Sequence, residues 1–327
     1  MRILVTGGAG FIGSHLAEAC LAAGHEVYVI DDLSTGSTKN ILHLQDDPAL
    51  SQRFFFHRDT ILNREIMMEL VGTCDAVYHL AAAVGVQYIL DNPLHSIRIN
   101  IQGTEMVLEL CAKFKKRVLI ASSSEVYGKH LHAPLTETDN IIYGPSSKFR
   151  WSYAASKLMD EFTALAYHRV SSLDVIIARL FNTVGPRQTG AYGMVIPRLT
   201  AQALSGKPLT VYGDGAQTRT FTHVADVVEA LMGLMASPNT NGELYNVGGI
   251  EEISMADLAK RIIRITDSKS EIHFISYEQA FPQGFEDMQR RVPDISKIHA
   301  AIGFAPKNDL DTILRQVAWY MRTHHSS

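Results

Sequence analysis

The chain has few cysteines, little excess charge and no long apolar run. Its three cysteines, Cys20, Cys74 and Cys111, lie far apart and have no metal-ligand or redox spacing, so we expect reduced, structural thiols and no metal site. With 30 basic and 34 acidic side chains, the net charge of -4 predicts no general attraction for nucleic acid. No segment resembles a signal peptide or a membrane span, which predicts a cytoplasmic protein without a membrane partner.

Short β-branched runs alternate with longer helical stretches in the first part of the chain. These runs are RILV, HEVYVI, RFFFH, DAVYHL, RVLIAS and LDVIIARL. Because they are continuously apolar, they are typical of strands buried on both faces by crossover helices. The sequence predicts an α/β fold with a Rossmann-type doubly wound parallel sheet over residues 1–185. Mixed strands, turns and helices over 186–327 predict a smaller mixed α/β substrate lobe, with some segments interleaved.

A glycine-rich segment, TGGAGFIG, follows the first predicted strand and opens the first helix. Its Gly7, Gly10 and Gly13 allow a tight turn and let a pyrophosphate approach the helix N-terminus. Asp31 ends the second predicted strand, where a carboxylate would bind the adenosine ribose and repel a 2′-phosphate. This spacing favours NAD over NADP. Asp59 ends the third strand, where it either reaches the adenine or stabilises a turn.

Tyr153 and Lys157 in WSYAASK are four residues apart, so on a helix they share one face. A lysine ammonium beside a phenol favours the phenolate, and an oxidised nicotinamide adds a second positive charge. The tyrosine can then act as a base near neutral pH. The pair predicts hydride chemistry.

An ordered set of motifs resembles the extended short-chain dehydrogenase/reductase family, in its nucleotide-sugar epimerase, dehydratase and decarboxylase branch. The motifs run essentially end to end and include TGGAGFIG, HLAA, NIQGT, SSSEVYG, YAASK, LFNTVGPR, MVIPR, VYGDGAQTRTFTHVAD and YNVGG. The resemblance implies that Tyr153 takes the proton from the carbon 4 hydroxyl of a UDP-sugar while hydride passes to NAD. It implies that Ser123 hydrogen-bonds that hydroxyl, that Lys157 binds the nicotinamide ribose, and that the enzyme is a homodimer.

The resemblance also implies the wider site. The implied catalytic residues are Ser123, Ser124, Glu125, Tyr153, Lys157 and Arg291. The implied cofactor-binding residues are Gly7, Gly10, Phe11, Ile12, Gly13, Asp31, Asp32, Asp59, Thr60, Leu80, Ala81, Ala82, Asn100, Tyr153 and Lys157. The implied substrate-binding residues are Asn182, Arg187, Val195, Arg198, Tyr212, Arg219 and Arg291.

Glu125 in SSSEVYG decides between reactions that share a 4-keto intermediate. A plain 4-epimerase needs no carboxylate there, whereas relatives that dehydrate or decarboxylate carry one. Ser124 stands where many dehydratases have an aspartate, and Arg291 matches the arginine that faces the substrate carboxylate in UDP-glucuronate decarboxylases. Arg187 lies where uronate epimerases are expected to hold a carboxylate.

These signals favour a UDP-glucuronate decarboxylase. A 4-epimerase acting on UDP-glucuronate or a UDP-hexose is the alternative, followed by a nucleotide-sugar 4,6-dehydratase. A non-catalytic regulator that binds NAD or a sugar nucleotide is a different class, because a fold does not fix a function. A regulator would not need Ser123, Tyr153 and Lys157 together.

Overall fold

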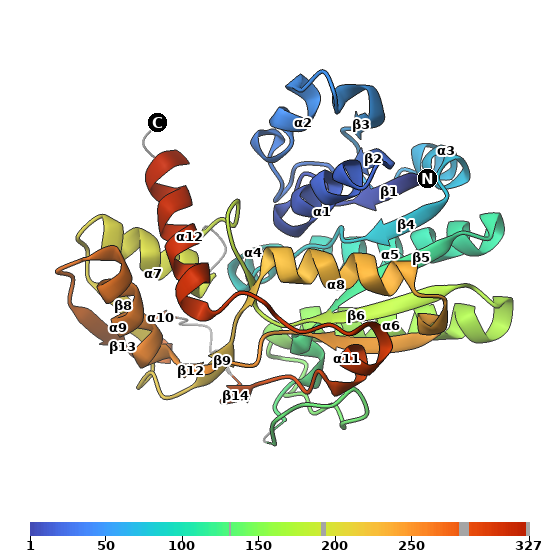
Figure 1. Ribbon diagram of the computed structural model, residues 1–327. Helices are drawn as coiled ribbons and strands as arrows, with labels where there is room; N and C mark the ends of the chain where they lie inside the picture. Colours follow the sequence, from blue (N-terminus) through green and yellow to red (C-terminus); the bar gives the residue numbers. More distant parts are fainter. Residues whose placement is uncertain (131, 191–193, 281–287, 325–327) are drawn as a thin grey trace.

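The computed structural model describes residues 1–130, 132–190, 194–280 and 288–324. A parallel sheet of seven strands forms its centre, in the spatial order β3-β2-β1-β4-β5-β6-β11 (Figure 1). The strands are β1 Arg2–Thr6, β2 Glu26–Ile30, β3 Phe54–His57, β4 Ala76–His79, β5 Arg117–Ser123, β6 Val175–Leu180 and β11 Glu243–Val247. This order is that of a doubly wound sheet, which confirms the predicted fold class.

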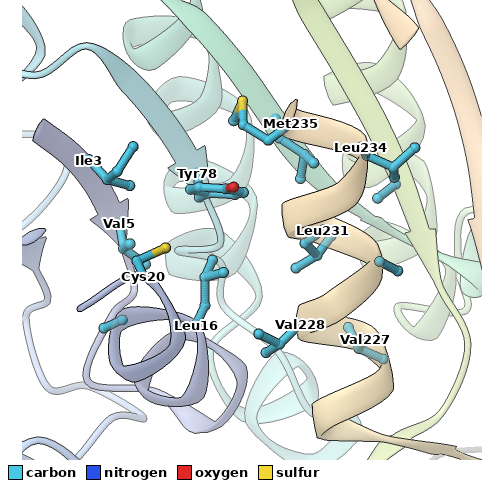
Figure 2. Packing of buried hydrophobic residues seen from close by; sticks show 14 of the residues in the cluster. Ile3, Val5, Leu16, Cys20, Tyr78, Val227, Val228, Leu231, Leu234 and Met235 are labelled. Atoms are coloured by element: carbon cyan, nitrogen blue, oxygen red, sulfur yellow. The ribbon is translucent and has the colours of Figure 1, made fainter. Parts of the chain in front are cut away.

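Helices cover both faces of the sheet. One face carries α1 Phe11–Ala22 and α8 Val224–Ala236, and the other carries α3 Arg64–Thr73, α5 Pro93–Phe114 and α6 Arg150–Ser171. Side chains alternate along each strand, so Ile3 and Val5 pack toward α1 and α8 while Leu4 packs toward the opposite helices. Figure 2 shows Leu16 of α1 and Leu231 of α8 in the first of these cores.

A smaller lobe lies beside the sheet (Figure 1). It has an apolar core of its own. Its elements are α7 Val195–Leu204, β8 Leu209–Tyr212, β9 Thr218–Thr220, β12 Glu252–Ser254, α9 Met255–Thr266, β13 Ile272–Ile275, α10 Tyr277–Ala280, β14 Arg290–Arg291 and α12 Leu310–His324. Leu199, Leu258 and Ile313 join α7, α9 and α12 in this core. Two short ladders, β8 with β13 and β12-β9-β14, complete the lobe.

A boundary after residue 185 does not fully separate the large sheet from the smaller lobe, because some later segments return to the sheet. Strand β11 and helix α8 come after that point but belong to the large sheet and its cover. Helix α11, Ser296–Ile302, also returns to the sheet, where Ile298 joins the α1 and α8 core. The remaining short elements are η1 Thr38–Asn40, α2 Leu42–Asp46, η2 Ser51–Arg53, α4 Val86–Asp91, η3 Ser124–Tyr127, β7 Thr183–Val184, β10 Thr222–His223 and η4 Pro238–Thr240.

The three cysteines are free and buried in the structure. Burial raises the pKa of Cys20 and of Cys74 to about 12, so both thiols stay protonated at neutral pH. Within the described ranges, no helix is long and apolar enough to cross a membrane. The same ranges contain no group of three His, Cys, Asp or Glu side chains arranged to hold a metal ion.

Candidate active site

A cavity of about 730 Å³ extends from the glycine loop at the sheet to the smaller lobe. It lies at the carboxyl ends of the central strands, where open α/β sheets bind ligands. The predicted residues that line it are Gly7, Gly10, Phe11, Ile12, Gly13, Asp31, Asp32, Asp59, Leu80, Ala81, Ala82, Ser123, Ser124, Glu125, Tyr153, Lys157, Asn182, Val195, Arg198, Tyr212, Arg219 and Arg291. Three others, Thr60, Asn100 and Arg187, do not line it.

The glycine loop forms a close-fitting cradle at one end of the cavity. Gly7 has a φ of 70°, and a Cβ on Gly13 would lie 2.1 Å from the Gly7 carbonyl oxygen. Gly10 caps helix α1 without any side-chain hydrogen bond, and the first turn of the helix carries no acidic residue. The free N–H groups at this helix N-terminus can therefore bind the pyrophosphate of a dinucleotide.

Asp31 is held rigidly beside this loop. Its carboxylate accepts hydrogen bonds from the Ala9 N–H at 2.9 Å and the Leu33 N–H at 2.8 Å. Burial raises the pKa of Asp31, and the backbone donors oppose that effect. The carboxylate oxygens can accept further bonds, so Asp31 can still receive ribose hydroxyl groups.

Asp59 lines the cavity but uses both carboxylate oxygens in its own turn. One oxygen accepts from the Thr60 N–H at 2.7 Å and the other from Asn63 Nδ2 at 2.8 Å. The turn-stabilising role considered for Asp59 thus occurs in the structure. Thr60 belongs to the same turn, where its hydroxyl accepts from the Leu62 N–H at 3.3 Å.

Asn100 lies behind the cavity wall, where it connects three segments. Its Oδ1 accepts from the Ala83 N–H at 2.8 Å, and its Nδ2 donates to Ser156 Oγ at 3.1 Å. These bonds join helix α5, the loop after β4 and helix α6. Asn100 therefore positions the helix that carries Tyr153 rather than lining the cavity itself.

Ser123, Tyr153 and Lys157 meet where β5 ends against α6. Ser123 Oγ accepts from the Glu125 N–H at 3.2 Å and also hydrogen-bonds the Tyr153 hydroxyl. Burial raises the pKa of Tyr153, while the Lys157 ammonium and the Ser123 hydrogen bond act in the opposite direction. This arrangement can transfer a proton through the Tyr153 hydroxyl, which needs added positive charge to ionise near neutrality.

Glu125 lies between two guanidinium groups in the same cavity. Its Oε1 is 2.5 Å from Arg291 Nη1, and its Oε2 is 3.2 Å from Arg150 Nη2. Burial alone would raise the pKa of Glu125, but the charges of Arg150 and Arg291 outweigh it and lower the pKa to about 2. Glu125 is therefore a permanent carboxylate at neutral pH.

Strand pairing in the smaller lobe places Arg291 in this cluster. Strand β14 pairs with β9, so Arg291 lies opposite Arg219. The positive charge of Arg219 lowers the pKa of Glu125 further. Arg291 Nη2 also donates to Asn182 Oδ1 at 2.6 Å. Residues 281–287, which precede strand β14 in the chain, lie outside the described residues. Three arginines thus surround one carboxylate.

Arg150 is a charged residue of the site that the sequence motifs did not single out. It precedes Tyr153 by three residues and Lys157 by seven, a spacing that puts all three on one helical face. That spacing was the available signal. Arg150 is only 8% exposed and lines the cavity.

Arg198 and Tyr212 form the far wall of the cavity in the smaller lobe. The Arg198 guanidinium lies 4.5 Å from the centre of the Tyr212 ring, and its Nη1 donates to the Thr210 carbonyl at 2.8 Å. Burial lowers the pKa of Arg198, and its Nε has no partner among the described residues. An anionic group such as a diphosphate would satisfy this buried charge.

Arg187 corrects an expectation from the sequence, because the structure does not place it at the cavity. Its backbone has a φ of 68°, and its Nη2 donates to Glu18 of helix α1 at 2.6 Å. The same guanidinium donates to Ser14 Oγ at 3.3 Å. A long-range ion pair therefore occupies the side chain that was expected to hold a substrate carboxylate.

The fold and the site define an extended short-chain dehydrogenase/reductase. The family model described as GDP-mannose 4,6 dehydratase matches residues 4–317, and the chain belongs to this family. The resemblance inferred from the motifs is confirmed, and the chain is an enzyme of the family.

Its relatives include decarboxylases and an epimerase. The chain is 40% identical, over 98% of its length and 97% of the relative, to the UDP-N-acetyl-alpha-D-glucosaminuronate decarboxylase of Bacillus cytotoxicus. It is 36% identical, over 95% of its length and 67% of the relative, to UDP-glucuronic acid decarboxylase 1 of Arabidopsis thaliana. The solved UDP-glucuronic acid 4-epimerase of Bacillus cereus, in complex with UDP-glucuronic acid and NAD, matches with a TM-score of 0.88. That match covers 99% of both chains at 32% identity.

Proposed function

We propose that this enzyme is an NAD-dependent decarboxylase of a UDP-hexuronate, with UDP-glucuronate as the expected substrate. The observation that carries the proposal is the contact between Arg291 and Glu125 in the cavity that also holds Tyr153. A guanidinium that is only 12% exposed near the base suits a substrate with a carboxylate. Arg291 Nε is buried without a partner among the described residues, so the side chain keeps a donor for that carboxylate.

The residues at the sheet edge fit NAD. Gly13 lets helix α1 start directly against the loop, because a Cβ there would collide with the Gly7 carbonyl oxygen. The α1 N-terminus offers free N–H groups, and Asp31 offers a carboxylate for the ribose. When bound, NAD supplies the hydride acceptor for carbon 4. Asp31 would also repel the 2′-phosphate of NADP, so we propose NAD as the cofactor.

Tyr153 takes the carbon 4 hydroxyl proton as that carbon is oxidised, and Ser123 hydrogen-bonds the same oxygen. The product is a β-keto acid, because the new ketone at carbon 4 and the carboxylate at carbon 6 flank carbon 5. The bond between carbons 5 and 6 breaks, carbon dioxide leaves, and the electron pair moves into an enolate. Ser123 and Tyr153 stabilise the enolate oxygen, and a proton then adds to carbon 5. As the hydride returns to carbon 4, Tyr153 gives its proton back to the carbon 4 oxygen.

The charge on Glu125 bears on the alternatives. A 4,6-dehydratase needs a base for the carbon 5 proton, and a carboxylate with a pKa of about 2 is a weak base at neutral pH. Glu125 instead orients Arg291. The 4-epimerase remains the second candidate, because a solved UDP-glucuronic acid 4-epimerase matches 99% of the chain. The sequence argument for an epimerase was the position of Arg187. That argument is weaker because Arg187 pairs with Glu18 away from the cavity.

We also propose that the enzyme is a cytoplasmic homodimer. Helix α6 exposes Met159 at 49% and Phe162 at 58%. Apolar side chains exposed together on a helix are suited to a partner helix. Sedimentation of the purified protein would give the mass of a dimer, and a monomer would contradict this part of the proposal.

The experiment is an incubation of the protein with NAD and UDP-glucuronate, followed by proton NMR with trapping of carbon dioxide. Loss of the carboxylate is expected. A parallel incubation contains UDP-N-acetylglucosaminuronate, because this is the substrate in the name of the Bacillus cytotoxicus relative. Conversion to UDP-galacturonate without carbon dioxide would establish the epimerase instead.

A further inference from the structure

A buried ion pair lies directly behind the proposed catalytic lysine. Lys157 Nζ donates to Asp160 Oδ2 at 2.9 Å, and the two side chains are only 3% and 1% exposed. The Thr104 hydroxyl of helix α5 hydrogen-bonds Asp160 and lies 3.0 Å from His79 Nε2. Asp160 does not line the cavity, so it would touch neither substrate nor cofactor.

Asp160 is the direct countercharge of this lysine. Burial favours a neutral amine, and the largest opposing influence on Lys157 is the Asp160 carboxylate. The other titratable groups acting on the pair are Tyr153 and Glu161 from α6 and His79 from β4, while Glu125 from η3 acts on Tyr153.

Neither His79 nor Glu161 replaces Asp160 in this role. Burial and the Lys157 charge lower the pKa of His79 to about 3, so His79 is neutral. Glu161 binds Arg179 at 2.6 Å, so its charge is already compensated. Among the described residues, Asp160 is thus the carboxylate in direct contact with Lys157.

We propose that Asp160 is a positioning residue that anchors the Lys157 ammonium, keeps it protonated, and sets the pH at which Tyr153 exchanges its proton. The inference rests on the proposed role of Tyr153 as the base. One ammonium N–H is held by Asp160, which leaves two for Tyr153 and a ribose hydroxyl.

The negative charge has a predictable effect on the coupled Tyr153 and Lys157 pair. A nearby anion opposes the loss of a proton from either group. Removing the Asp160 charge therefore lowers both macroscopic pKa values of the Tyr153 and Lys157 pair. Asp160 therefore keeps the tyrosine from becoming too acidic. That setting suits a phenol that must first accept a proton and later return it.

The test is Asp160→Asn, which keeps the shape and an acceptor oxygen but removes the charge. Tyr153 ionisation is followed by tyrosinate absorbance in NAD-saturated protein, and the matched Tyr153→Phe variant is subtracted because the chain has 12 tyrosines. The Tyr153 midpoint should fall by about one pH unit. Both limbs of the pH profile of kcat should move to lower pH with it.

Asp226→Asn is the control, because Asp226 is buried but outside the cavity, where it accepts from Asn308 Nδ2 at 2.8 Å. It should leave the Tyr153 midpoint in place. If Asp160→Asn does not fold, Asp160→Ser serves the same comparison. An unmoved midpoint in the folded variant would overturn the inference. The titration needs no sugar substrate, so a shifted midpoint without carbon dioxide release would refute the proposed function alone.

Discussion

Replacing Glu125 with glutamine removes the carboxylate charge that both Arg150 and Arg291 contact. A folded-state pKa of about 2, against an ordinary 4.5, corresponds to about 3 kcal/mol of stability at neutral pH. Because the pKa is lowered on folding, this contribution is present above pH 4.5 and is lost as the pH falls from 4.5 toward 2. At pH 4 the wild type should already have lost about 1 kcal/mol of it.

The assay is urea denaturation of wild type and Glu125→Gln at pH 7 and pH 4. The variant should be less stable by up to about 3 kcal/mol at pH 7, and the gap should narrow by about 1 kcal/mol at pH 4. Glu109→Gln is the control, since Glu109 pairs with Arg64 on the exposed surface and should have a much smaller effect. A gap that is equal at both pH values would refute the reasoning.

Three further changes test the site. Tyr153→Phe should lower kcat by ~10²–10⁴-fold while calorimetry shows UDP-glucuronate binding largely unchanged, because only the proton acceptor is removed. Arg150→Met leaves Glu125 with one fewer guanidinium and should reduce carbon dioxide release by about tenfold, with the acid limb of the kcat profile moving to higher pH. Gly13→Ala places a Cβ 2.1 Å from a loop carbonyl oxygen and should abolish NAD binding in a fluorescence titration. Gly72→Ala is the control and should leave NAD binding unchanged, because its Cβ would lie no closer than 3.7 Å to any atom outside its own helix.

The parts of the site that sequence predicted best depend on short, fixed spacings. The glycine loop, Asp31 and the Tyr153–Lys157 pair each follow from a strand end or one helical turn. The alternating strands likewise predicted the sheet. These features are local, so they need no knowledge of how distant segments pack.

Other parts depend on long-range packing that spacing does not encode. Arg291 meets Glu125 across 166 residues because β14 pairs with β9, and only the family resemblance pointed to it. Arg187 was expected at the substrate, but its left-handed backbone and the Glu18 carboxylate on α1 hold it elsewhere. Asp160 lies only three residues after Lys157, so the spacing itself indicates an ion pair, but the burial of both side chains is not visible in the sequence.

The most direct test of the decarboxylase proposal is carbon dioxide release from UDP-glucuronate by wild type and by Arg291→Lys. Lysine keeps the charge but loses the paired donors that contact Glu125 and Asn182. We expect the wild type to release one carbon dioxide per UDP-glucuronate consumed and the variant to release it far more slowly. Inversion at carbon 4 by the wild type with the carboxylate intact would contradict the proposal.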